Sequence, residues 1–333
     1  STFRLSGDTE ISSANDLTLG NLELGGNKLS LDFASVGNAT FILPNELTMD
    51  NVGSVIETRG SNLELSNALQ LNSGSITSTG GTLRFTGGLT MGASGVLDVT
   101  GSTLSVSGAL DLSVGTFSSN SSVLKLEDAA TLSSNSPVSF GSLNLNDKVL
   151  TLGSATTQLN ITDANTALAL SGITLETGDG SLTLSGALTM SNGAELNSSG
   201  GTITLNSGGS LASGSTLSLP DSTLVLQNAL AISASTLKTK NTTLTTNGKA
   251  LSLSAGILEV EGTQDLSGVS TDGTGTLRLI ANTSLNDNAA LSVGTLDLAD
   301  FALTLDDAMA GLSVSQAVTL DAATEQIISG DAD

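Results

Sequence analysis

The chain has 333 residues, of which 32 are acidic and 10 are basic, and it contains neither histidine nor cysteine. The lack of cysteine excludes disulfides and thiolate metal sites, and the lack of histidine excludes Ser-His-Asp and Cys-His catalysis. The net charge of −22 repels the phosphates of nucleic acids and anionic membrane surfaces. No apolar run is long enough to insert into a bilayer. We therefore expect neither nucleic acid nor a membrane as a partner.

Hydrophobic residues make up 38% of the chain, whereas aromatic residues make up only 2%. This composition supplies an aliphatic core, mainly of leucine, but not the bulky side chains that fill a broad globular interior. The length would ordinarily suit two domains, but a repeat protein has no such limit, because each unit contacts only its neighbours. The composition therefore indicates a narrow repeat structure.

Taken in order, residues 1–16 are polar and only weakly alternating, which predicts an N-terminal segment acting as a lead-in strand or an assembly arm. Residues 17–333 are predicted to form a single continuous solenoid, less regular at 133–181 and after 240. The repeat is clearest at Leu184–Met190, Leu205–Leu211 and Leu226–Ile232, whose starts lie 21 residues apart. A fixed period of this length is typical of stacked β-coils.

Each repeat carries up to three apolar-x-apolar triplets, such as Leu63–Leu65 and Leu69–Leu71. In a strand, residues i and i+2 share a face, so each triplet directs two side chains inward and one outward. Glycine, serine and asparagine between the triplets favour tight corners. We therefore predict an all-β fold, a right-handed parallel β-solenoid with three short strands per coil. At about 20 residues per coil, the chain would hold about sixteen coils.

Charged residues provide a test of this arrangement, because seven of them stand in the middle of a triplet and should face water. These residues are Glu23, Glu64, Arg84, Asp111, Lys125, Arg278 and Asp297. Stacking of coils places Glu64 beside Arg84 of the next coil. The same column continues through Ser105 and Lys125. An exposed ion pair between coils contributes a few tenths of a kcal/mol and helps to fix the register.

Four carboxylates near the C-terminus are the candidates for a metal site, because Ca²⁺ prefers oxygen ligands. They are Asp297, Asp300, Asp306 and Asp307. A solvated acidic face explains the same residues and is the expected outcome, with Ca²⁺ binding as the alternative. The nonapeptide of calcium-binding coils and the glycine-rich loops of nucleotide sites are absent. We predict no catalytic residues and no organic cofactor.

Two other functions of β-solenoids depend on a specialised outer face. Polysaccharide lyases and hydrolases need clustered acids and bases, but the arginines at 4, 59, 84 and 278 are scattered along the chain, so we expect no enzyme. An ice-binding face needs two adjacent threonine columns. Thr183, Thr204 and Thr245 form one column, interrupted by Val225, and we expect them to be ordinary outward β-formers.

The string LTLSGALTMSNGAELNSSGGTITLNSGGSL resembles the β-helical passenger regions of bacterial autotransporters and haemagglutinin-type exoproteins. The resemblance extends over nearly the whole chain, but it comes from repeats without a diagnostic motif, and no functional residue is carried over. It implies a secreted, cell-surface protein used for adhesion, display or matrix building.

We therefore predict a non-enzymatic, extracellular structural or adhesive solenoid of a cell surface. The chain begins without methionine, and strand pattern runs to both termini, which indicates either a piece of a longer solenoid or subunits that stack through uncapped ends. Expected partners are further copies of the chain, in head-to-tail or lateral assembly, or surface glycans. The alternatives are a carbohydrate-active β-helix that binds or cleaves polysaccharide, and an ice- or mineral-binding solenoid.

Overall fold

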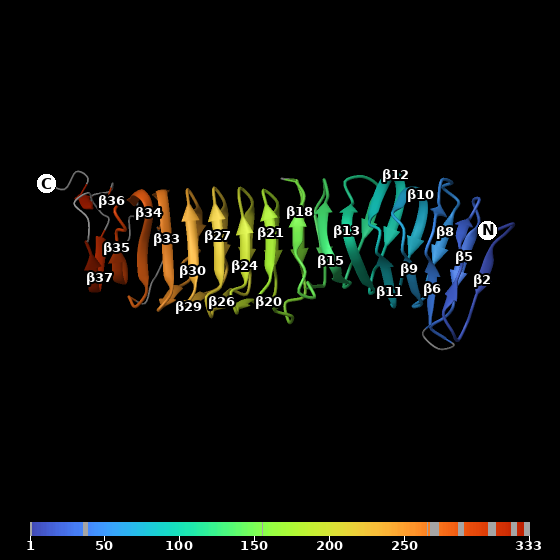
Figure 1. The fold of residues 1–333 in the computed structure, drawn as a ribbon, viewed down its shortest axis with the longest axis horizontal. Coiled ribbons are helices and arrows are strands. Elements are labelled where there is room, and N and C mark those ends of the chain that lie inside the picture. Colours follow the sequence, from blue (N-terminus) through green and yellow to red (C-terminus); the bar gives the residue numbers. More distant parts are fainter. Residues whose placement is uncertain are drawn as a thin grey trace. The chain divides into compact units, whose positions relative to one another are not determined.

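The computed structural model describes residues 2–35, 39–154, 156–264, 266, 273–285, 290–305, 311–320 and 325–329. These residues form short strands joined by tight corners, and no helix occurs among them. Close contacts between backbones divide the chain into two compact units, Ser1–Asp163 and Ala164–Asp333. In each unit, strands from successive coils lie side by side and run parallel (Figure 1).

The predicted all-β parallel solenoid is confirmed. Taken together, the two units hold about 14 turns of roughly 21 residues. In the second unit, for example, three consecutive strands each pair in parallel with the matching strand one turn later. The prediction of about sixteen coils was too high, and the length of the individual turns varies. Leu22 pairs with Leu47, and Leu303 pairs with Ile327, which are steps of 25 and 24 residues.

The first unit contains nineteen named strands, several of which bend around a corner and serve two faces of the coil. On the face that carries most of its charged triplets lie β3 (Leu17–Thr18), β6 (Thr40–Leu43), β9 (Asn62–Leu65), β11 (Thr82–Phe85), β13 (Thr103–Asp111), β15 (Val123–Ser133) and β17 (Ser142–Asn144). The remaining strands are β1 (Thr2–Arg4), β2 (Thr9–Ile11), β4 (Asn21–Glu23), β5 (Lys28–Leu31), β7 (Leu47–Thr48), β8 (Val55–Glu57), β10 (Leu69–Thr77), β12 (Leu89–Asp98), β14 (Thr116–Ser118), β16 (Val138–Phe140), β18 (Leu150–Leu152) and β19 (Gln158–Ile161).

The second unit contains the strands β20 to β38. One face is formed by β22 (Ser181–Leu184), β25 (Thr202–Leu205), β28 (Thr223–Leu226) and β31 (Thr243–Thr245). A second is formed by β20 (Leu168–Ser171), β23 (Leu188–Ser191), β26 (Gly209–Ala212), β29 (Leu230–Ser233) and β32 (Leu251–Ser254). The other strands are β21 (Thr174–Gly178), β24 (Glu195–Ser198), β27 (Thr216–Pro220), β30 (Thr236–Lys240), β33 (Ile257–Gln264), β34 (Thr276–Leu285), β35 (Ala290–Asp297), β36 (Ala302–Leu305), β37 (Gly311–Thr319) and β38 (Gln326–Ser329).

The core of each unit is a thin column of aliphatic side chains, as the composition predicts. In β22, Leu182 and Leu184 are 0% and 1% exposed. The alternate residues of this strand, Ser181 and Thr183, face outward. Four of the seven phenylalanines, Phe33, Phe41, Phe85 and Phe140, are fully buried in the first unit, where the ring centroids of Phe33 and Phe41 lie 6.0 Å apart. Stacked leucines therefore bury apolar surface from coil to coil, which is the main stabilising contribution in such a structure.

Buried hydroxyl groups bridge successive coils at the corners. The Thr58 hydroxyl donates to Ser78 at 2.9 Å, and the Ser102 hydroxyl donates to Ser78 from the other side, also at 2.9 Å. In the second unit the Ser222 hydroxyl donates to Ser198 at 3.1 Å. All five side chains are at most 4% exposed. Because these buried hydroxyls find partners in an adjacent coil, they incur no penalty for unsatisfied polar groups.

Replacing Leu184 with Asp is expected to destabilise the second unit by about 3 kcal/mol or more, because the carboxylate would lie unpaired between apolar side chains. The matched control is Thr183→Asp, one residue away and directed outward, which should have little effect. Denaturant unfolding of the full chain followed by circular dichroism measures both. Equal losses of stability in the two variants would contradict the assignment of inward and outward faces.

Candidate functional site

The seven charged side chains at the centres of triplets all face outward and are partly exposed, as the alternation predicts. Their neighbours in the triplet are buried. In β11, for example, Leu83 and Phe85 are both 0% exposed on either side of Arg84. The chemistry of the outer faces therefore depends on which of these side chains meet across successive coils.

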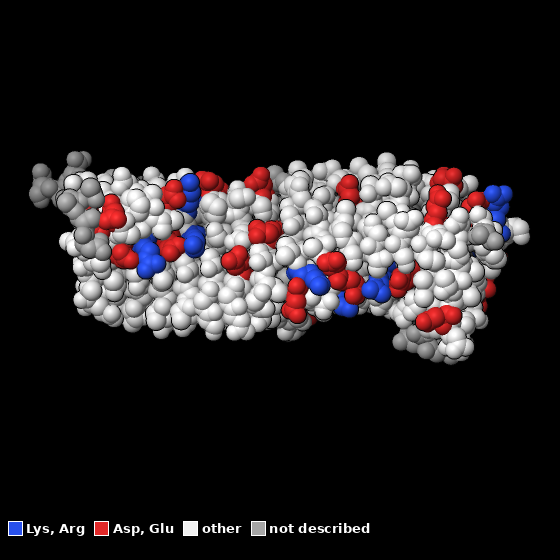
Figure 2. Space-filling view, in the orientation of Figure 1, with Lys and Arg blue, Asp and Glu red and all other residues white. Residues whose placement is uncertain are grey.

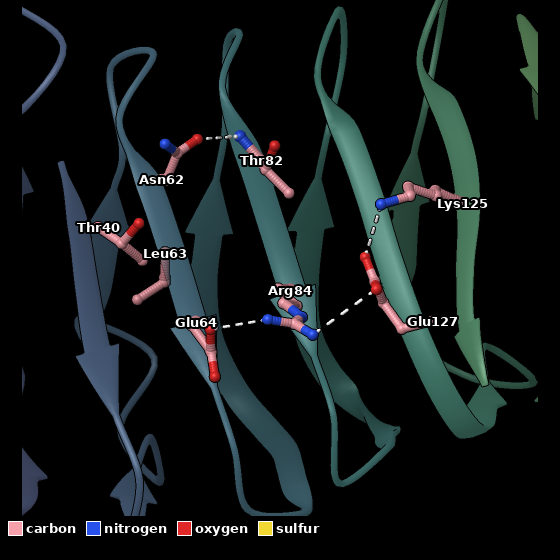
Figure 3. A pocket seen from close by; sticks show the side chains of 8 residues that line it. All are labelled: Thr40, Asn62, Leu63, Glu64, Thr82, Arg84, Lys125 and Glu127. Carbon is pink, nitrogen blue, oxygen red and sulfur yellow. Dashed lines mark hydrogen bonds and ion pairs between the residues drawn. The ribbon is translucent and has the colours of Figure 1, made fainter. Parts of the chain in front are cut away.

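In the first unit, a charged cluster joins β9, β11 and β15. Arg84 pairs through Nη1 with Oε2 of Glu64 at 3.1 Å, and through Nη2 with Oε2 of Glu127 at 3.6 Å. The Nζ atom of Lys125 lies 2.9 Å from Oε1 of Glu127. The predicted pairing of Glu64 with Arg84 is thus confirmed, including the register that places them opposite one another. Figure 3 shows these side chains converging from neighbouring strands.

The cluster borders a shallow depression of about 400 Å³. Its lining consists of Thr40, Asn62, Leu63, Glu64, Thr82, Arg84, Lys125 and Glu127 (Figure 3). The lining offers an amide, hydroxyls, two carboxylates and two cationic groups, whose formal charges cancel. Such a surface can exchange hydrogen bonds with a polar, uncharged ligand, but it has no aromatic ring on which a sugar could stack.

The protonation state of Glu127 follows from its neighbours. The Ser105 hydroxyl donates to its carboxylate at 2.6 Å, and with Lys125 it lowers the pKa of Glu127 below the ordinary value, against a smaller opposing effect of burial. Glu127 is therefore ionised at neutral pH. A glycosidase needs a carboxylic acid whose pKa is raised, so that it can protonate the leaving group. The environment of Glu127 favours a salt-bridged carboxylate over that role.

A second charged cluster lies among the first strands of this unit. Arg59 contacts both Glu57 and Glu10 at 2.8 Å, and Lys28 contacts Glu57 at 2.7 Å. Hydrogen bonds from Lys28 and Arg59 lower the pKa of Glu57, so this carboxylate is also held ionised. The arginines that look scattered in the sequence are thus brought to acidic partners by the coil register.

In the second unit, four alternating charges form a ladder across β30, β33, β34 and β35. Lys238 pairs with Glu259 at 3.2 Å, Glu259 with Arg278 at 3.5 Å, and Arg278 with Asp297 at 2.9 Å. Beside it, Lys240 pairs with Glu261 at 3.1 Å. Figure 2 shows basic side chains lying against acidic ones on a surface that is otherwise mostly uncharged. All ten basic residues fall within the described residues, and eight of them form ion pairs.

Two of the four calcium candidates, Asp297 and Asp300, fall within the described residues. The Asp297 carboxylate is engaged by Arg278, and Asp300 is exposed, with its backbone N–H donating to Glu325 at 2.9 Å. Asp306 and Asp307 lie outside the described residues. Among the residues that are described, no group of three or more acidic side chains could hold a metal ion.

The threonine column expected from the sequence is present in register. Thr183 pairs with Thr204, Thr204 with Val225, and Val225 with Thr245. The structure adds a second column beside it on the same face, formed by Ser181, Thr202, Thr223 and Thr243. The i, i+2 spacing of threonine in Thr202–Thr204 and Thr243–Thr245 carries this signal in the sequence, because both residues of such a pair face outward.

Sequence reasoning also missed Glu127, which completes the charged cluster of the first unit. It lies just past the apolar-x-apolar triplet that contains Lys125, so the triplet pattern alone does not include it. The i, i+2 spacing of Lys125 and Glu127 on β15 is the signal that places both on the outer face.

No protein-family model matches the chain, and neither a curated protein nor a solved structure gives a match. Among the described residues, no helix is long and apolar enough to cross a membrane. The resemblance to autotransporter passenger regions therefore stays a prediction.

Replacing Glu127 with Gln is expected to lower stability at neutral pH by about 1 kcal/mol or less, because water screens a partly exposed ion pair. Since the folded-state pKa is lowered, the stabilising contribution is present above the ordinary carboxyl pKa and is lost as the pH falls through the folded value. The difference in melting temperature between the natural chain and Glu127→Gln should therefore shrink between about pH 5 and pH 3.

The control is Asp128→Asn, which removes an exposed neighbouring carboxylate. Thermal unfolding of the three proteins across that pH range gives the comparison. A difference for Glu127→Gln that stays constant down to pH 3 would show that the ion pairs do not stabilise the fold.

Proposed function

We propose that this chain is a non-enzymatic structural or adhesive β-solenoid of a cell surface or extracellular fibre. The main observation behind this proposal is that eight of the ten basic side chains form ion pairs. Most of these ion pairs join one coil to another. An enzyme would need such basic side chains free to bind substrate or transfer protons. In this chain they instead stabilise the alignment of neighbouring coils. The remaining outer positions carry mostly serine, threonine and asparagine, which suit a display surface in water.

Composition is the first support for an extracellular location. The chain has no cysteine that an oxidising compartment could crosslink, and its strong negative charge keeps a repetitive protein soluble and prevents unspecific association. The resemblance of the repeats to the passenger regions of exoproteins also supports an extracellular location. The solenoid can act alone or in assembly with further copies.

Immunogold electron microscopy of intact cells that carry the gene tests this function directly. Antibodies against the purified chain are expected to label the outside of unpermeabilised cells, on a coat or on fibres, because a surface scaffold must be accessible there. Cells with the gene deleted provide the control. Gold that is found only inside sectioned cells would contradict the surface assignment.

A second candidate is a polysaccharide-binding solenoid, favoured by the depression beside Arg84. Its charges cancel, so a neutral glycan would meet no net repulsion there, in contrast to the strongly negative molecule as a whole. Without an aromatic platform the affinity should be low, with a Kd on the order of 1 mM.

A glycan array with the full chain tests this candidate, with Arg84→Met and Arg278→Met as a matched pair. Both variants remove the arginine of an inter-coil ion pair, but only Arg84 borders the depression. Glycan binding at the depression is expected to be lost in Arg84→Met and kept in Arg278→Met. Equal binding by both variants would exclude the depression as the site.

A further inference from the structure

One face of the second unit presents a two-column array of short side chains, which we call the hydroxyl grid. Its four rows are Ser181 with Thr183, Thr202 with Thr204, Thr223 with Val225, and Thr243 with Thr245. The rows follow one another at steps of 21, 21 and 20 residues, and they pair in parallel without a register shift. Six threonines, one serine and one valine therefore occupy eight neighbouring positions.

The grid is held in place from below. The residue between the two members of each row points into the core, and these four side chains are Leu182, Ile203, Leu224 and Leu244, none more than 6% exposed. Threonine and valine are branched at Cβ, which restricts rotation about χ1. Both the backbone and the side chains of the grid are thus largely fixed before any ligand arrives.

The hydroxyl groups of the six grid threonines are free to bond to water. Within the described part of the chain, none of them donates to or accepts from another protein group, whereas many other threonines bond to a backbone carbonyl. Thr189 on the neighbouring face bonds to Leu168, and Thr239 bonds to Glu259. Only Ser181 in the grid is engaged, as acceptor of the Thr202 backbone N–H at 3.2 Å.

The grid is also distinct in charge. The adjacent face of the same unit carries the ladder of Lys238, Glu259 and Arg278, whereas no grid position is charged. A mineral surface made of cations would require carboxylates, and crystalline polysaccharide would require aromatic rings to stack on. Neither occurs among the eight positions. Six of the eight side chains are threonines, and each of these presents both a methyl and a hydroxyl group.

The spacing of the grid is set by the β-sheet. Neighbouring rows are about 4.8 Å apart, and the two columns are about 6.6 Å apart, twice the rise per residue in a strand. Water oxygens at the surface of an ice crystal repeat at distances comparable to both. A rigid array of hydroxyls can therefore hold bound water in positions that continue the ice lattice, while the methyl groups fill the spaces between the waters.

We propose that the hydroxyl grid of β22, β25, β28 and β31 binds ice. This inference is independent of the cell-surface function and of the depression near Arg84. The valine at position 225 is the one position that lacks a hydroxyl, and it retains the methyl groups that contact the lattice. The grid of four rows is small, so its effect should be to inhibit the growth of ice crystals and not to prevent freezing.

Inhibition of ice recrystallisation by the full chain, followed by microscopy below 0 °C, tests the proposal. Thr204→Tyr places a bulky but strand-compatible ring in the middle of the grid. Its matched control is Thr216→Tyr, on the outward side of β27 on a different face. The concentration needed to halve crystal growth is expected to rise about tenfold or more for Thr204→Tyr, the change produced by losing roughly 1.4 kcal/mol of binding. Thr216→Tyr should behave as the natural chain does.

The variant Val225→Thr completes the array and is expected to act at a lower concentration than the natural chain. Circular dichroism and melting temperature confirm that each variant is folded. If the natural chain inhibits crystal growth no better than an unrelated acidic protein of equal concentration, the proposal is overturned. It is likewise overturned if the two tyrosine variants lose activity equally, because ice would then contact some other face.

Discussion

Most strands in this protein bond in parallel register to the strand one coil earlier and the strand one coil later. Because side chains alternate along a strand, a slip of one residue would move a leucine column to the outside and an ion-pair column into the core. The buried leucines, the corner hydroxyls and the ion pairs all depend on the same register, and each of them opposes such a slip. The register of the stacked coils therefore determines both the stability of the fold and the arrangement of side chains on its surface.

The alignment also explains how a chain with a threefold excess of acids uses its few bases. Arg84 and Arg278 each lie between acidic residues contributed by different coils, so that one cation links carboxylates that would otherwise repel one another. Each pair contributes little in water, but a ladder of pairs favours one register over its neighbours. Because eight of the ten bases pair with acids and acids are in threefold excess, most of the acidic charge is left unpaired by bases.

The sequence predicts the architecture well because inward leucines must recur wherever a strand recurs. The same period places Glu64 opposite Arg84 and Thr183 opposite Thr204. The triplet pattern leaves out Glu127 and the second column of the hydroxyl grid, because both lie just outside the apolar-x-apolar triplets, where only the i, i+2 spacing to an outward residue marks them. Nor does the period give the length of each turn, because insertions between Leu22 and Leu47 lengthen a turn without disturbing its strands.

The unequal length of the turns has a consequence for how such a gene can change. Steps between paired residues range from 19 residues, between Arg4 and Glu23, to 27, between Leu29 and Ile56, and the difference is absorbed at the corners. We therefore expect small insertions and deletions in corner codons to preserve the fold, while those in strand codons shift the register and disrupt it. A tandem duplication of one whole turn supplies a new coil with its own leucines and corner hydroxyls. Proteins of this kind can thus lengthen by recombination between their own repeats.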